Sequence, residues 1–347
     1  MRNEPERRGD DEIDLFELVQ GIWRQKIWVA IIALPITILG IAYASLASPV
    51  YEAKLYVQPP SQNDVAQLNY GRGGDSGLGL FSIKDVYEVY LRSLQSEAVR
   101  NNFFRTVYLT TLGEEERSGS RDALYNQFNG LLKVGMAAKD SPLRYVITAN
   151  VEDPQQAATW VATYAEMAAD KAKREVLRGN QSEALVKADN LQQEIASAKV
   201  TARKHREDEI VQLKEALRVA RSIGLEKPPI ISGEVSSEVS AGMNGALIYM
   251  RGSNALEAEI ANLESRASDD PFIKGLRGKQ EKLTFYRNLK IDPSLIAVYQ
   301  QDGVVDQPDK PVKPRKVIIV LLSALVGLGL GVVVALGRDV WVRRRVA

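Results

Sequence analysis

Two long runs of apolar residues, one near each end of the chain, dominate its hydrophobic pattern. Residues 27–46 read IWVAIIALPITILGIAYASL and residues 317–336 read VIIVLLSALVGLGLGVVVAL, with no charged side chain in either run. At a rise of about 1.5 Å per residue, each run makes a helix about 30 Å long, the thickness of the hydrocarbon core of a bilayer. A buried helix of a soluble domain usually keeps one polar face. We therefore predict two transmembrane helices.

The residues between the two runs predict a small antiparallel sheet. Residues 51–57 alternate in polarity with a period of two, as a strand does. Residues 131–137 and 143–151 predict a hairpin around a turn at 139–142. A last strand is predicted at 295–301, before the chain enters the second apolar run.

Helical spacing of apolar residues predicts a helix at 82–107 and a much longer one after Pro154, because no further proline interrupts the chain as far as Lys227. Apolar residues recur along this long helix every three or four positions: Leu185, Ala188, Leu191, Ile195, Ala198, Ala202, Ile210, Leu213, Leu217, Ala220 and Gly224. So narrow a stripe needs a partner. After a turn at 226–242, residues 246–267 and 272–289 are expected to return as that partner, with Gly179 a position where the long helix could bend.

Polar stretches complete the pattern. Residues 13–26 predict an amphipathic helix that leads into the first apolar run. Residues 61–79 are polar and rich in glycine, which predicts a flexible loop. They lack the Gly-Lys-Ser/Thr ending of a phosphate-binding loop, so we expect no nucleotide site there. Five basic residues precede the first apolar run, Arg2, Arg7, Arg8, Arg24 and Lys26, and only Lys54 follows closely. Basic residues near a transmembrane helix stay in the cytoplasm, so we expect both termini there and the middle of the chain outside.

Composition excludes several classes of function. The chain has no cysteine and a formal net charge of +1, which gives no reason to expect disulfides or nucleic acid. The only histidine, His205, lies in a charged part of the long helix, and the acidic clusters at 114–116, 207–209 and 269–270 are typical of solvated surface. We therefore expect no enzyme, no catalytic or metal-binding residue and no cofactor.

Small residues recur every four positions in the second apolar run, at Ser323, Gly327, Gly331 and Ala335, and more weakly in the first, at Gly40 and Ala44. Helix backbones approach closely along such a stripe, so these residues are the candidate positions for packing of transmembrane helices. Pairing within one chain and pairing between chains both remain open.

Four segments resemble the chain-length determinant (Wzz-like) family of bacterial polysaccharide co-polymerases, over residues 11–336. They are IDLFELVQGIWRQK before the first apolar run, YMRGSNALEAEIANLESR at 249–266, DPFIKGLRGKQEKLTFYRNL at 270–289, and the pattern PxxPxxPRK before the second run. The resemblance implies an inner-membrane protein of the branch without a kinase domain. Such a protein regulates the length of O-antigen chains that a separate membrane polymerase extends.

The predicted fold is therefore an α+β membrane protein, in which two transmembrane helices flank a periplasmic α/β base with a long extended helical hairpin. The expected segments are a cytoplasmic N-terminal segment (1–26), the first transmembrane helix (27–46), the first part of the base (47–153), the long and returning helices (154–290), a return strand with a proline-rich segment (291–316), the second transmembrane helix (317–336) and a cytoplasmic tail (337–347).

The resemblance also implies partners. These are further copies of the chain in a ring, with an octamer favoured, the O-antigen polymerase, membrane lipid and, as a further candidate, lipid-linked polysaccharide. The proline-lysine segment (residues 308–316) is the candidate functional motif, through Pro308, Pro311, Pro314, Lys310, Lys313, Arg315 and Lys316. Its prolines favour a stiff, extended chain. Its cations could face the polymerase, the pyrophosphate of the lipid carrier, or the phosphates of membrane lipids.

Two other classes of protein share parts of this pattern. A periplasmic adaptor of an efflux or export complex also combines an N-terminal anchor with a helical hairpin, but the second apolar run and the lack of flanking β repeats argue against it. A transmembrane receptor would need a cytoplasmic output domain, for which we expect no room.

Overall fold

The computed structural model describes residues 23–229 and 245–346, and the chain divides into two compact units. Unit 1 comprises Met1–Ser61, Ile83–Ala172 and Ala297–Ala347, and unit 2 comprises Gln62–Ser82 and Lys173–Ile296. These boundaries differ from those expected at 154 and 290, because the first turns of the long helix pack in unit 1 and residues 62–82 pack in unit 2. Most of the amphipathic helix predicted at 13–26 and of the turn predicted at 226–242 lies outside the described residues.

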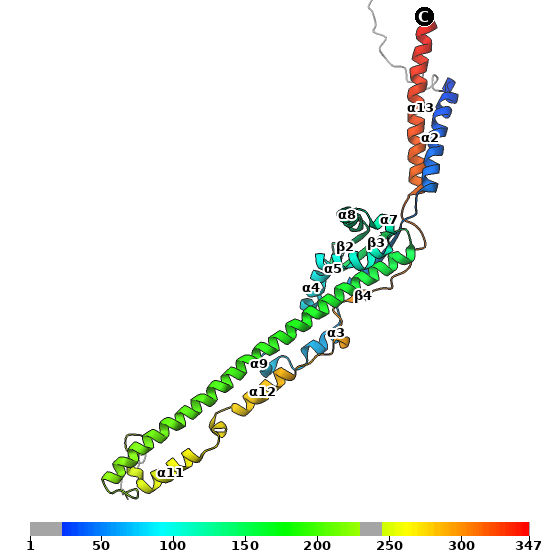
Figure 1. Cartoon of the computed structure of the whole chain (residues 1–347). Coiled ribbons are helices and arrows are strands. Elements are labelled where there is room, and N and C mark those ends of the chain that lie inside the picture. The colour runs from blue at the N-terminus through cyan, green and yellow to red at the C-terminus, as the bar shows by residue number, and fades with distance from the viewer. Residues whose placement is uncertain (1–22, 230–244, 347) are drawn as a thin grey trace, which may run out of the picture. The chain divides into compact units, whose positions relative to one another are not determined.

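Two apolar helices of unit 1 lie side by side (Figure 1). Helix α2 spans Lys26–Leu46 and helix α13 spans Lys316–Val346. Both are long and apolar enough to cross a membrane, α13 over Lys316–Arg338. The first helix begins and ends within one residue of its predicted bounds, whereas α13 continues about ten residues beyond the predicted end, since the following residues keep a helical backbone.

The base of unit 1 contains one four-stranded sheet, with antiparallel neighbours in the order β2-β3-β1-β4. Its strands are β1 (Tyr51–Gln58), β2 (Leu132–Ala138), β3 (Ser141–Val151) and β4 (Gln300–Asp302). Pairing of Ala138 with Ser141 shortens the predicted four-residue turn to two residues. The last strand is also shorter than predicted, because Pro293–Leu295 form a 3-10 turn.

The helix predicted at 82–107 is wrong as a single element. The structure has α4 (Ile83–Leu94), α5 (Glu97–Phe103), a π-helical turn (Phe104–Tyr108), α6 (Leu109–Thr111), α7 (Glu114–Arg117) and α8 (Arg121–Leu131). The break between α4 and α5 has a local cause. Ser96 leaves the helical conformation, and its hydroxyl oxygen accepts from the amide of Val99 at 3.2 Å, as a helix N-cap does.

Aromatic side chains fill the space between the sheet and the helices of unit 1. Phe103 is fully buried and stacks against Phe128, with Trp160 and Tyr164 edge-on at 5.8 and 5.5 Å. The rings of Tyr90 on α4 and Tyr299, the residue before β4, stack in parallel with their centres 4.5 Å apart. This contact holds the start of β4 against α4. Because aromatic rings bury large areas each, this cluster is the main apolar core of the base.

Two neighbouring buried tyrosines of α4 provide a matched test of this core. The Tyr87 hydroxyl donates to the carbonyl of Leu143 at 2.8 Å, whereas the Tyr90 hydroxyl has no hydrogen-bond partner among the described residues. Burial raises the pKa of both phenols, so both stay protonated at neutral pH. We expect Tyr87→Phe to lower the free energy of unfolding by about 1 kcal/mol and Tyr90→Phe to leave it unchanged or raise it, as measured by denaturant unfolding. Equal losses in both variants would contradict this assignment.

Helix α9 (Pro154–Ser222) is unbroken, and within unit 2 its later turns pack against α11 (Ser253–Ser265) and α12 (Leu276–Asn288), as Figure 1 shows. Leu213 and Ala220 pack with Leu256, Ile260 and Leu263 of α11. Ala188 packs with Tyr286 of α12. The predicted antiparallel partners of the long helix are thus α11 and α12.

Two details of the predicted stripe on α9 are wrong, although the helix itself is continuous as predicted, Gly179 included. Leu185 is exposed and Ala184 is buried in its place, since the buried positions before Ala188 recur every four residues. Gly224 lies beyond the end of α9, where its φ of +71° and the bond from the amide of Leu225 to the carbonyl of Ala220, 2.9 Å, make a Schellman cap.

The segment before α11 closes the hairpin against this cap. The amide of Ser253 donates to the carbonyl of Leu225 at 3.0 Å. Gly252 has φ +83°, and a Cβ atom placed there would lie 2.7 Å from the carbonyl oxygen of Glu226. Only glycine fits this position, because a side chain would meet backbone and the conformation is left-handed.

Candidate functional site

The proline-lysine segment is held against the start of the base. The amide of Val50 donates to the carbonyl of Lys313 at 3.0 Å, and the amide of Val312 donates to the carbonyl of Val50 at 2.8 Å. Val50 follows α2 and the proline-lysine segment precedes α13. The two connections between the membrane helices and the base are therefore joined by backbone hydrogen bonds.

The side chains of this segment differ in exposure. All four cations are exposed: Lys310, Lys313, Arg315 and Lys316. Pro311 is exposed, Pro308 and Pro314 are partly buried, and the peptide bond between Lys313 and Pro314 is cis. The segment thus presents positive charge to its surroundings from a backbone that is fixed at residue 313.

The small residues of α13 lie against α2. A Cβ atom at Gly327 would lie 3.0 Å from the Cα of Ala33, and one at Gly331 would lie 2.9 Å from the carbonyl oxygen of Val29. A Cβ atom at Gly40 would overlap the side chain of Ser323. The structure therefore brings the two helices together within one chain, with backbones in direct contact.

The ends of this helix pair are also packed. Ala44 and Ala335 are both buried, although most neighbouring side chains on the two helices are exposed. At the end of the pair next to Ala335, the guanidinium of Arg338 lies 4.0 Å from the centre of the Trp28 ring, a cation–π contact. All six small residues singled out in the sequence thus belong to one intrachain interface or its immediate flank.

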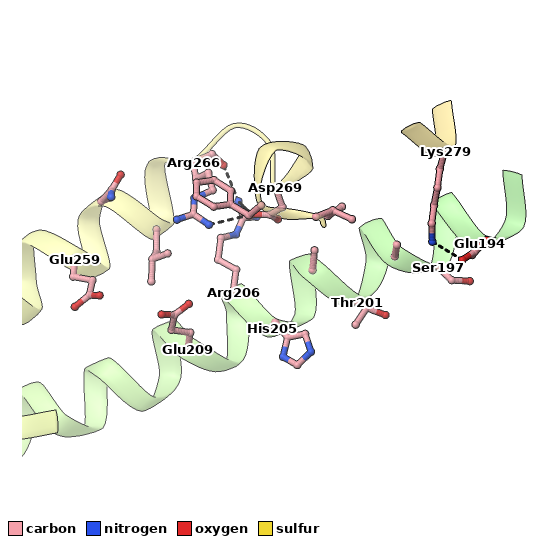
Figure 2. A pocket seen from close by; sticks show the side chains of 16 residues that line it. Glu194, Ser197, Thr201, His205, Arg206, Glu209, Glu259, Arg266, Asp269 and Lys279 are labelled. Atoms are coloured by element: carbon pink, nitrogen blue, oxygen red, sulfur yellow. Dashed lines mark hydrogen bonds and ion pairs between the residues drawn. The ribbon is translucent and has the colours of Figure 1, made fainter. Parts of the chain in front are cut away.

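A cleft of about 790 Å³ lies in unit 2 where α11 ends and the chain passes to α12 (Figure 2). The Asp269 carboxylate forms ion pairs with Arg206 at 3.3 Å and with Arg266 at 3.6 Å, and the Arg266 guanidinium covers the Phe272 ring at 3.8 Å. Lys279 pairs with Glu194 on α9. The expectation that Asp269 is solvated surface charge is wrong, because these two arginines bury and neutralise it.

His205 lines this cleft without a metal-binding neighbourhood. In residues 23–229 and 245–346, no group of three or more histidine, aspartate or glutamate side chains is placed to hold a metal ion. The charges that line the cleft largely neutralise one another in pairs. The arrangement offers hydrogen bonds and one exposed aromatic ring, and it fixes the direction of the chain between α11 and α12.

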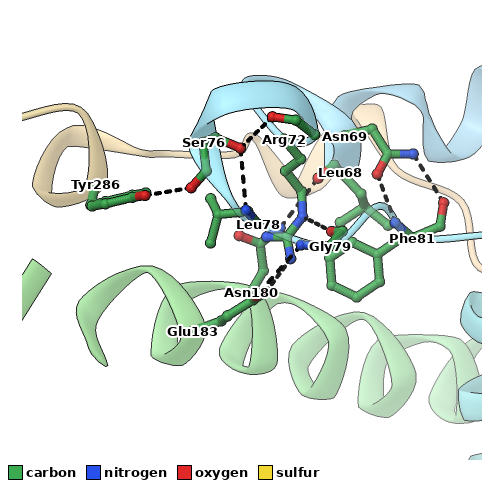
Figure 3. A network of polar contacts seen from close by, with 11 residues as sticks. Leu68, Asn69, Arg72, Ser76, Leu78, Gly79, Phe81, Asn180, Glu183 and Tyr286 are labelled. Carbon is green, nitrogen blue, oxygen red and sulfur yellow. Dashed lines mark hydrogen bonds and ion pairs between the residues drawn. The ribbon is translucent and has the colours of Figure 1, made fainter. Parts of the chain in front are cut away.

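A buried ion pair fixes the loop at 69–82 on α9, also within unit 2 (Figure 3). The Arg72 side chain is 2% exposed and pairs with Glu183, which is 38% exposed. The Nε of Arg72 donates to the carbonyl of Gly79 at 2.5 Å, and its guanidinium lies 4.6 Å from the Phe81 ring. The flexible loop predicted at 61–79 is therefore wrong: α3 (Gln62–Ala66) and this network order it.

Further hydrogen bonds in Figure 3 complete the network. The hydroxyl of Tyr286 on α12 donates to the carbonyl of Ser76, and the side-chain amide of Asn180 donates to the carbonyl of Leu68 at 3.3 Å. Asn69 both donates to and accepts from the backbone of Phe81, at 3.0 and 2.8 Å. The loop thus joins α9 to α12. The sequence showed Arg72 among glycines but held no signal that linked it to Glu183, 111 residues away.

Comparison with known proteins finds similarity to one family. Residues 11–107 match the family model described as Wzz, chain length determinant protein. A chain length determinant protein of Shigella dysenteriae is 23% identical over 332 residues, which cover 95% of this chain and 93% of the relative. The corresponding protein of Salmonella typhimurium is 22% identical over 343 residues, covering 96% and 94%.

Solved structures share the fold. A full-length bacterial polysaccharide co-polymerase aligns with a TM-score of 0.70 at 22% identity and covers 95% of this chain and 99% of its own. The wild-type Shigella flexneri lipopolysaccharide O-antigen chain-length regulator WzzBSF aligns with a TM-score of 0.51 at 19% identity, covering 75% and 99%. The predicted fold class is thereby confirmed. The chain is thus similar in sequence to chain length determinant (Wzz) proteins along nearly its whole length, and it shares the fold of a polysaccharide co-polymerase.

Proposed function

We propose that this protein regulates the length of O-antigen polysaccharide chains, as an oligomeric periplasmic scaffold that acts on a separate membrane polymerase. The observation that carries the proposal is the similarity to chain length determinant proteins over 95% of the chain, together with the full-length co-polymerase fold. Both ends of the base enter the membrane through a single helix pair, which suits a scaffold that must stand beside an integral membrane enzyme.

The proposed orientation places both termini in the cytoplasm and the bulk of the chain in the periplasm. It rests on the excess of basic residues before α2. In this orientation the proline-lysine segment lies at the outer surface of the inner membrane, and its four exposed cations face the polymerase or the phosphates of lipids. Because its backbone is hydrogen-bonded to Val50, a movement of the base would be transmitted directly to α13.

One feature of α9 supports self-assembly. Val186, Val200 and Val211 are exposed and lie 14 and 11 residues apart, close to whole numbers of helical turns, so they share one face of the helix. The buried residues Leu213 and Ala220 face α11 on the opposite side. An apolar stripe on the side away from the hairpin partners suits contact with another copy of the chain. The favoured octamer remains a prediction.

Deletion of the gene from its native bacterium tests the proposed function. We expect the gel ladder of surface lipopolysaccharide to lose its preferred band size, because polymerisation then lacks its length control, and a plasmid copy to restore it. The double variant Val200→Asp/Val211→Asp should form smaller assemblies by native mass spectrometry and restore the ladder poorly. An unchanged ladder with increased drug sensitivity would instead support an efflux adaptor.

A further inference from the structure

A second pocket lies in unit 1, on the base, with a volume of about 430 Å³. Its lining comes from five segments far apart in the sequence: the residue before β1, the stretch from the π-helical turn through α8 to β2, the end of β3 with the residue after it, the first turns of α9 and the proline-lysine segment. Pockets of this size accept small organic groups, larger than a bare inorganic ion. It shares Lys313 and Val50 with the proline-lysine segment and its attachment to the base, and the rest of its lining has no part in the function proposed above.

Two buried aromatic side chains form part of its wall. Tyr108 and Trp160 are 2% and 3% exposed, and their rings meet edge to face at 5.8 Å. The Tyr108 hydroxyl has no hydrogen-bond partner among the described residues. Burial raises the pKa of Tyr108, so this hydroxyl stays protonated and can donate at neutral pH. A buried donor without an acceptor is unfavourable, and an occupant with an oxygen acceptor would satisfy it.

Two cations and one carboxylate lie at the rim. Lys133 of β2 and Lys313 of the proline-lysine segment are exposed lining residues, and Glu152, just after β3, carries the opposing charge. Asn150 adds an amide from β3. An excess of ammonium groups over carboxylates favours an anion, and phosphate oxygens accept from lysine, amide and hydroxyl donors alike.

Chain length fixes how far this pocket can lie from the membrane. Lining residue Val50 follows the end of α2 at Leu46 by four residues, and Lys313 precedes the start of α13 at Lys316 by three. An extended chain advances at most about 3.6 Å per residue, so both residues lie within about 14 Å of a helix end. The headgroup layer extends about 5–8 Å beyond the hydrocarbon core on each side, so this upper limit keeps the pocket within reach of lipid headgroups.

We propose that this pocket binds the phosphorylated headgroup of a lipid in the outer leaflet of the same membrane. Lys133 and Lys313 hold the phosphate oxygens, Tyr108 donates its hydroxyl to the occupant, and Asn150 and Glu152 accept from hydroxyl or amino groups of the head. A glycerophospholipid and a polyprenyl diphosphate that carries a sugar share this chemistry. The outer leaflet follows from the membrane orientation proposed above, whereas the site does not depend on the proposed control of chain length.

Native mass spectrometry of the full chain, released from nanodiscs, tests the site. The nanodiscs contain phosphatidylethanolamine with a small fraction of either phosphatidylglycerol or undecaprenyl diphosphate bearing one sugar. We expect the wild type to retain one of these lipids, and Lys133→Ala/Lys313→Ala to retain at least about tenfold less, since each lost charge-assisted bond weakens binding strongly. Tyr108→Phe should retain several-fold less. The preferred lipid identifies the source of the phosphate.

Lys84→Ala/Lys139→Ala is the matched control, because it removes two exposed positive charges from unit 1 without touching the lining of the pocket or the proline-lysine segment. It should retain lipid as the wild type does. Equal loss in both double variants would mean diffuse attraction to the membrane and would overturn the pocket, as would equal retention in all variants. The lipopolysaccharide ladder is measured separately, so failure of either proposal can be told from failure of the other.

Discussion

Replacing Gly331 with leucine should separate the two membrane helices and abolish the control of chain length. A Cβ atom at this position would already lie 2.9 Å from the carbonyl oxygen and 3.0 Å from the Cα of Val29, and backbone cannot move aside as a flexible side chain can. Forcing extra atoms into a packed interface costs about 1–3 kcal/mol, a shift of roughly fivefold to 150-fold in the pairing equilibrium. We expect the preferred band of surface lipopolysaccharide to disappear.

Gly329 supplies the control for this substitution. It lies on the same helix two residues away, and a Cβ atom there would have no neighbour within 4 Å. Gly329→Leu carries the same change in volume and hydrophobicity, so it should leave both the ladder and the amount of membrane-inserted protein unchanged. If Gly329→Leu and Gly331→Leu gave the same ladder, the helix contact would have no part in the function.

The second large effect is expected at Glu183. Removing its carboxylate leaves the Arg72 guanidinium buried without its counter-ion, and one of its terminal nitrogens already has no hydrogen-bond partner among the described residues. Breaking a buried ion pair from one side typically destabilises by about 3–5 kcal/mol, and because Glu183 is partly exposed we expect Glu183→Ala to lie at the lower end, about 3 kcal/mol. Hydrogen exchange at residues 69–82 should become much faster.

Glu215→Ala is the matched variant on the same helix. Glu215 is exposed, and its side chain makes no ion pair or hydrogen bond with any residue in 23–229 or 245–346, so its loss should change neither the unfolding midpoint nor exchange in the loop. Equal exchange of residues 69–82 in the Glu183 and Glu215 variants would show that the loop is held by other contacts.

Local periodicity explains what the sequence could predict. The uncharged runs, the alternation at β1 and the three- to four-residue stripe of α9 each lie within one stretch of chain, so α2, α13, β1, the hairpin and the partners of α9 were predictable. The sequence did not predict which residues before Ala188 are buried. The buried positions there are small or polar, including Ala184 and Asn180, while the more hydrophobic Leu185 faces outward.

The features that the sequence did not predict depend on contacts between segments that are far apart along the chain. Arg72 meets Glu183, and Lys313 meets Val50, only after the chain has folded, and neither pair has a spacing that a local pattern records. The small residues at Gly327 and Gly331 predicted close helix packing, but the choice between one chain and two required coordinates. The pocket beside Tyr108 and Trp160 combines five separate segments and left no sequence signal.

The pairing of both membrane helices within one chain is tested most directly by a disulfide between them. A Cβ atom at Gly327 would lie 3.3 Å from the Cβ of Ile36, just below the usual separation of bonded cysteines, and the natural chain has no cysteine. In native membranes, Ile36→Cys/Gly327→Cys should oxidise to an intrachain bond, so the protein migrates as a monomer and resists alkylation until reduced. Disulfide-linked dimers, or free thiols in an inserted protein, would contradict the pairing.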